Sequence, residues 1–75
     1  MKTEYQYLVF VQQPSNGKTS IWSCQNKHYG EELGIVKWFG SWRQYCYFPT
    51  VPATYSTGCL QDISSFIEQL KGEQK

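Results

Sequence analysis

The chain has 75 residues, enough for one domain, and a domain of this size buries only about 60–65% of its unfolded surface. Its formal net charge is +1 with 17% charged residues, and its lysines are scattered, which argues against the basic stripe that grips duplex DNA. No run reaches the roughly 18 apolar residues of a membrane span. Aromatic residues make up 17% of the chain and can supply a dense core.

The cysteines point to a reducing compartment. Their number is odd, and Met1 is not followed by the apolar run of a secretory signal, so we expect a cytoplasmic protein with free thiols. Cys24, Cys46, Cys59 and His28 could serve as metal ligands, but no Cys-x-x-Cys pair is present, and buried, inert thiols are the favoured interpretation. We therefore expect neither a metal nor a cofactor.

The first predicted hairpin starts with a strand over residues 4–13, where apolar and polar side chains alternate. Its apolar face would carry Tyr5, Tyr7, Val9 and Val11. Asn16-Gly17 is the strongest short signal for a two-residue turn of type I′. With that turn, Val11 lies opposite Trp22, and the partner strand covers about residues 19–26.

Residues 27–32 are polar and contain a glycine, so we expect a turn or a short helical connection. The second predicted hairpin follows, with strands at 33–39 and 42–48 around a Gly40-Ser41 loop. In that register Trp38 lies opposite Arg43.

The last predicted element is a helix over about residues 58–71, which Ser56 or Thr57 can cap. Its apolar stripe consists of Leu60, Ile63, Phe66, Ile67 and Leu70. The fold class is thus α+β, a single domain over residues 1–75 with a four-stranded antiparallel sheet of two hairpins and one C-terminal helix on one face. The opposite face would be solvated, covered by residues 27–32, or used to bind a partner.

The segment 38–49 is dense in aromatic residues and contains the only arginine. One hypothesis is a binding platform on the side of the sheet away from the helix, where Arg43 lies over Trp38. The proposed binding residues are Trp38, Arg43, Tyr45, Tyr47 and Lys37. The alternative is that aromatic cross-strand pairs only stabilise a small sheet and that Arg43 covers them.

A cysteine nucleophile with His28 as its base is the one catalytic arrangement that can be drawn. His28 falls in a predicted loop, Asp62 is the only aspartate available to orient it, and no glycine-rich oxyanion or phosphate loop is present. We expect that the protein is not an enzyme.

Two segments resemble a known group of proteins. Residues 38–49 read WFGSWRQYCYFP and residues 59–67 read CLQDISSFI. With these segments the chain resembles, over about residues 19–70, a group of small uncharacterised proteins of bacteriophages, prophages and related bacteria. The resemblance implies a small phage accessory protein that binds and blocks a component of the bacterial host, such as a defence system; it implies no chemistry.

Two kinds of partner suit the aromatic platform. The favoured one is a host or phage protein, bound through the aromatic face or an exposed strand edge, and such an edge would also allow a homo-oligomer. The other is a nucleotide or a single-stranded nucleic acid, whose bases stack on the rings while Lys37 or Arg43 contacts phosphate. The near-neutral charge favours the protein.

Overall fold

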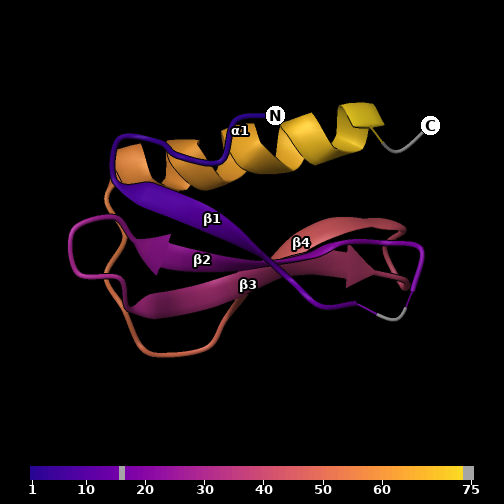
Figure 1. Ribbon diagram of the computed structural model, residues 1–75, viewed down its shortest axis with the longest axis horizontal. Coiled ribbons are helices and arrows are strands. Elements are labelled where there is room, and N and C mark those ends of the chain that lie inside the picture. The colour runs from indigo at the N-terminus through magenta and orange to yellow at the C-terminus, as the bar shows by residue number, and fades with distance from the viewer. Residues whose placement is uncertain (16, 74–75) are drawn as a thin grey trace.

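A computed structural model describes residues 1–15 and 17–73. Within these ranges the elements are β1 (Leu8–Gln13), β2 (Ile21–Asn26), β3 (Glu32–Phe39), β4 (Gln44–Pro49) and α1 (Thr57–Glu73). The strands form one antiparallel sheet in the order β1-β2-β3-β4, and α1 lies across one of its faces (Figure 1). The predicted α+β architecture is confirmed.

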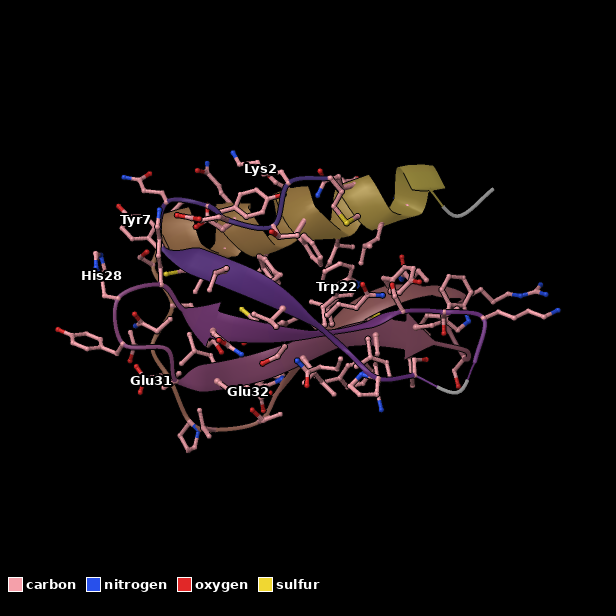
Figure 2. The ribbon with its side chains drawn as sticks, in the orientation of Figure 1. Lys2, Tyr7, Trp22, His28, Glu31 and Glu32 are labelled. Atoms are coloured by element: carbon pink, nitrogen blue, oxygen red, sulfur yellow. The ribbon has the colours of Figure 1, made fainter. Side chains whose placement is uncertain are left out.

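The core lies between the sheet and α1, and an aromatic stack forms its centre. The rings of Phe10 and Phe66 are parallel, with centroids 4.1 Å apart and an interplanar angle of 1°. Tyr5 and Trp22 meet Phe66 edge-on, and Trp22 points into the space between sheet and helix (Figure 2). Offset and edge-to-face contacts of this kind add to the large apolar area that each ring buries.

The apolar stripe of α1 is narrower than predicted. Ile63, Phe66 and Leu70 are buried as expected, but Leu60 is 56% exposed. Leu60 precedes Phe66 by six residues, which places it about 120° around the helix from Phe66. Cys59, seven residues before Phe66, falls within about 20° of it and packs against the core.

The ends of α1 agree with the prediction to within two residues. The backbone N–H of Cys59 donates to Ser56 Oγ at 3.2 Å, so Ser56 is the capping residue. The helix continues to Glu73, which makes Gly72 part of the helix rather than the residue that ends it.

The first hairpin has a different register from the predicted one. Val11 pairs with Ser23 rather than with Trp22, and the connection spans residues 14–20. The proposed type I′ turn includes Asn16, which lies outside the described residues. Within the connection, Ser15 Oγ donates to the Thr19 carbonyl at 2.8 Å and accepts from the Gly17 N–H at 3.4 Å.

This one-residue shift moves every side chain of β1 to the other face of the sheet. Leu8 and Phe10 are buried under α1, whereas Tyr7 and Val11 are exposed. The predicted apolar face of β1 was therefore wrong for the strand itself. The observed register buries a leucine and a phenylalanine, which contribute more apolar area than the valines that it leaves out.

The strand predicted from residue 4 begins at residue 8, because residues 3–7 turn back along β1. Tyr5 N–H donates to the Leu8 carbonyl at 2.8 Å, and Phe10 N–H donates to the Thr3 carbonyl at 2.8 Å. This turn runs beside α1 (Figure 1) and brings Tyr5 into the core. The only aspartate, Asp62, holds it in place, because its Oδ2 accepts from the Tyr7 N–H at 3.0 Å.

The second hairpin keeps Trp38, Tyr45 and Tyr47 on one side of the sheet, as predicted, but its strand pairing is shifted by two residues. Trp38 pairs with Tyr45, and Phe39 pairs with Gln44, so the turn consists of residues 40–43. Arg43 belongs to this turn rather than to a strand, and its N–H donates to the Gly40 carbonyl at 3.2 Å. Residues 27–31 form an exposed turn at the opposite end of the sheet.

Phe66→Ala should lower the free energy of unfolding by about 3–5 kcal/mol, because it leaves a cavity against Phe10. The matched control is Leu60→Ala, which removes a large side chain from the exposed side of α1 and should cost less than about 0.5 kcal/mol. Urea denaturation followed by circular dichroism measures both. Equal losses would show that α1 packs through a different stripe.

Candidate functional site

The structure separates the residues of the predicted platform onto two sides of the sheet. Trp38, Tyr45 and Tyr47 lie on the face that α1 covers, and Tyr45 is buried in the core. Their predicted position away from the helix was wrong, because β4 packs against α1 through this face. Lys37 points to the other face, and Arg43 lies in the turn between β3 and β4.

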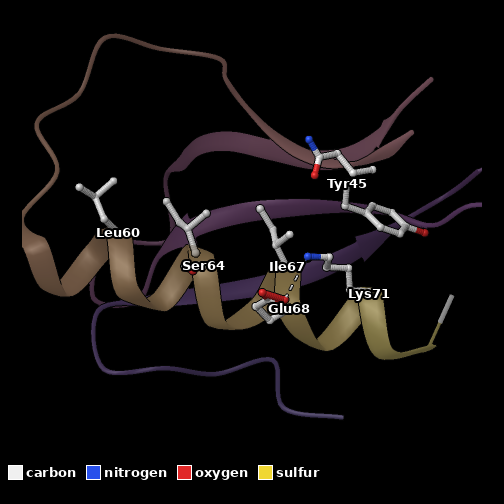
Figure 3. A pocket seen from close by; sticks show the side chains of 8 residues that line it. Tyr45, Leu60, Ser64, Ile67, Glu68 and Lys71 are labelled. Atoms are coloured by element: carbon white, nitrogen blue, oxygen red, sulfur yellow. Dashed lines mark ion pairs between the residues drawn. The ribbon is translucent and has the colours of Figure 1, made fainter. Parts of the chain in front are cut away.

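Trp38, Arg43 and Tyr45 nevertheless stay together in one hollow. A cleft of about 200 Å³ lies between the β3–β4 turn and the end of α1. We call it the turn cleft; it is lined by Trp38, Arg43, Gln44, Tyr45 and Lys71. A neighbouring hollow of about 290 Å³ continues along α1, with Tyr45 on one side and Leu60, Ser64, Glu68 and Lys71 on the helix side (Figure 3).

The ring that forms the base of the turn cleft is held from several sides. Tyr45 meets Trp38 edge-on, with centroids 5.5 Å apart. The Tyr45 hydroxyl accepts from the Ser20 N–H at 3.2 Å, and Ser20 Oγ accepts from Trp22 Nε1 at 2.8 Å. These contacts connect the cleft to the core and fix the orientation of both cleft rings.

Arg43 has an unusual backbone conformation, with φ at 53° in the left-handed region. Glycine or asparagine usually occupies such a position, and another residue costs about 1 kcal/mol or more there. The guanidinium forms no ion pair with any side chain that the structure describes. The chain thus has a cation at a place where backbone energetics favour glycine.

We call the sheet face away from α1 the open face. One row of paired residues crosses all four strands on this face, with apolar side chains on three of them: Val11, Ser23, Ile35 and Phe48. No helix or strand of residues 1–15 and 17–73 packs on this face. Ser23 is buried on this face, and its hydroxyl is satisfied by donating to Glu32 Oε1 at 2.8 Å.

Near the β3–β4 turn the open face carries an aromatic cluster. Phe39 is its centre and contacts Trp42 and Phe48 edge-on, at centroid distances of 5.1 and 5.9 Å. Lys37 Nζ lies 5.0 Å from the Phe48 ring centre. Trp42 is 67% exposed. We call Lys37, Phe39, Trp42 and Phe48 the open-face cluster.

Sequence reasoning missed Trp42, Phe39 and Phe48 as candidate binding residues. Their ring contacts place these three residues together on the face that α1 leaves open. The alternation of side chains along a strand assigns residues to two faces, but it does not show which face the helix covers. Tyr45 and Tyr47, which lie on the opposite face from Phe39 and Phe48, were equally good candidates for exposed residues.

The largest hollow, about 390 Å³, lies at the end of the sheet that is opposite the β3–β4 turn. His28, Glu31 and Cys59 are among its lining residues, and Figure 2 shows His28 and Glu31 at this end. Among the described residues, no three His, Cys, Asp or Glu side chains form a metal-ligand group.

Comparison with known proteins shows where the chain belongs. It is 36% identical to the "Uncharacterized 9.3 kDa protein" of Acholeplasma phage L2 over 73 residues, which cover 97% of this chain and 92% of the phage protein. The chain belongs to the family of this phage protein. No family model matches the sequence, and no solved structure matches the fold.

In the part of the chain that the structure describes, no helix has the length and apolar character needed to cross a bilayer.

The three cysteines of this phage-type protein are unpaired and differ in environment. Cys24 is fully buried, and burial raises the pKa of its thiol from 9.0 to about 12. Beside it, burial raises the pKa of Tyr47, whose hydroxyl is 2.5 Å from that of Tyr55. Cys46, predicted to point inward, lies on the open face opposite Lys37 and is half-buried.

Arg43→Gly should change the free energy of unfolding by less than about 1 kcal/mol, because relief of the left-handed strain offsets the extra freedom of the unfolded chain. Arg43→Ala keeps a Cβ at φ 53° and should be the less stable of the two. Thermal melts compare them. A loss above about 2 kcal/mol in Arg43→Gly would mean that the guanidinium has a structural role.

Cys24 should resist alkylation by iodoacetamide in the native protein near about pH 8, while Cys46 and Cys59 react. Peptide mass mapping with and without urea distinguishes the three sites.

The raised pKa of Cys24 also predicts that the free energy of unfolding falls as pH rises above 9.0, because the thiol of the unfolded chain then loses its proton before the folded one does. Cys24→Ala should make this fall shallower; rapid native labelling of Cys24 would contradict its burial.

Proposed function

We propose that this protein is a non-enzymatic phage accessory protein that works in the cytoplasm of the bacterial host by binding another protein. Its binding site is the open-face cluster, and its partner is a host component such as a defence system, which it inhibits by occupying a surface. The observation that carries the proposal is Trp42, a tryptophan that is 67% exposed although it packs on Phe39.

The composition of the cluster supports a protein partner. Tryptophan is enriched at the energetic centres of protein interfaces, and an apolar patch bordered by polar groups is a common form of docking surface. Toward the other end of the open face from Trp42 lies a polar group, in which Ser23 and the Glu32 carboxylate link Gln25 and Thr50. Phe39, which itself packs on Phe48, holds the indole of Trp42 in place, so little side-chain freedom is lost on binding.

The charges of the cluster suggest the chemistry of the partner. Lys37 lies over the half-buried ring of Phe48 and is the cation of the cluster. A partner with an apolar surface and a carboxylate positioned over Lys37 would complement it. The groups with strongly shifted pKa values, Cys24 and Tyr47, lie in the core, where they contribute to packing.

We further propose that residues 42–45 and 59–67 are common to the family, and the support for this is what they do in the fold. The first segment places Trp42 and Arg43 in the turn and Tyr45 in the core. The second contains Asp62, which holds the N-terminal turn, and Phe66, which stacks on Phe10.

A photo-crosslinking amino acid at position 42 should capture a specific host protein from a lysate, and one at position 29 should not. Tyr29 is the matched control, because it is an 83% exposed aromatic residue in the turn at the other end of the sheet. With the captured protein purified, Trp42→Ala should weaken binding by about 2 kcal/mol or more, roughly thirtyfold, and Tyr29→Ala should have no effect.

Light scattering on the same variants tests self-association. A dimer that Trp42→Ala dissociates, without any host protein captured at position 42, would mean that the open face binds a second copy instead. Equal affinity of Trp42→Ala and wild type for the captured protein would also refute the proposed site.

A further inference from the structure

We propose that the turn cleft is a binding site for a nucleoside phosphate, either a free nucleotide or one unit of a single-stranded nucleic acid. The cleft combines two cations, Arg43 and Lys71, with the ring of Trp38. This site is separate from the open-face cluster, because Trp38 and Tyr45 lie on the covered face. The two proposals can therefore fail independently.

Charge complementarity favours a phosphate group between Arg43 and Lys71. A guanidinium matches a phosphate with two parallel hydrogen bonds, and a phosphate dianion suits two cations. Lys71 contacts Glu68 at 3.6 Å, but both side chains are more than half exposed, so this pair is weak and a bound anion can compete with Glu68 for the ammonium group. Arg43 has no carboxylate partner in the described part of the chain.

The rings and amides of the cleft suit the rest of a nucleotide. Trp38 is half-buried and held edge-on by Tyr45, so it offers a fixed surface on which a base can stack. Gln44 lines both the turn cleft and the neighbouring hollow, where its amide can bond a base edge. Ser64, in the neighbouring hollow, can reach a sugar hydroxyl.

The left-handed conformation of Arg43 agrees with this role. Glycine at position 43 would be the easier choice for the backbone, so the arginine is kept at a cost of about 1 kcal/mol or more. A cation that binds a ligand accounts for that cost. The same property makes a clean test, because Arg43→Gly removes the cation while it relieves the backbone.

The experiment is a titration of tryptophan fluorescence with AMP, UMP and a short oligothymidylate. Adenosine and ribose 5-phosphate are the partial probes and should bind about tenfold more weakly or worse than AMP. Arg43→Gly should weaken nucleotide binding at least about tenfold, and so should Lys71→Gln. The matched control is Lys37→Gln, which loses the same charge on the opposite face and should bind like wild type.

The length of the probe distinguishes a free nucleotide from a single-stranded nucleic acid. Tighter binding of the oligothymidylate than of the mononucleotides assigns the site to a nucleic-acid strand, and equal or weaker binding assigns it to free nucleotides. The proposal is overturned if neither kind of probe gives a saturable response at millimolar concentration. It is also overturned if folded Arg43→Gly binds as wild type does, or if Lys37→Gln loses as much affinity.

Discussion

The stack of Phe10 on Phe66 is the interaction on which the rest of the structure depends. It fixes the face of β1 that packs under α1, and thereby the face of every strand paired to β1. Because α1 is the one helix that the described residues form, it can cover only that face. A chain with 17% aromatic residues then has more large rings than the covered core accepts, and the remainder lie on the open face.

This division of rings explains why two different candidate sites lie on either side of one hairpin. Neighbouring residues of β3 and β4 alternate between faces, so Trp38 and Tyr45 line a cleft beside α1 while Phe39 and Phe48 face away from it. The turn between them contributes Trp42 to the open face and Arg43 to the cleft. Each site thus has an exposed turn residue supported by strand residues that the sheet holds in place.

The sequence was sufficient for the element order and the helix stripe around Phe66, because these follow from the periodicity of apolar residues and from turn residues. It was insufficient for register. Asn16-Gly17 suggested a two-residue loop, but a longer connection gives the pairing of Val11 with Ser23, which buries Phe10. In the segment LVFV the side chains on both faces of the strand are apolar, so the pattern does not indicate which face packs into the core.

The candidate sites depended on the same ambiguity. Lys37, Trp38, Arg43, Tyr45 and Tyr47 could be picked out as a group because the segment is unusual in composition. Their division between two faces required the position of α1, which comes from contacts distant in sequence. The left-handed conformation of Arg43 was equally hidden, since a turn placed at Gly40-Ser41 puts Arg43 in a strand.

The central claim is that the protein has one covered and one open apolar face, and methyl NMR with a soluble paramagnetic probe tests it most directly. On the covered side the methyl groups of Leu8, Val36 and Ile63 should be protected. On the open side those of Val11 and Ile35 should relax more strongly, because no helix or strand among the described residues packs on this face. Equal protection of Val11 and Val36 in dilute protein would contradict the account.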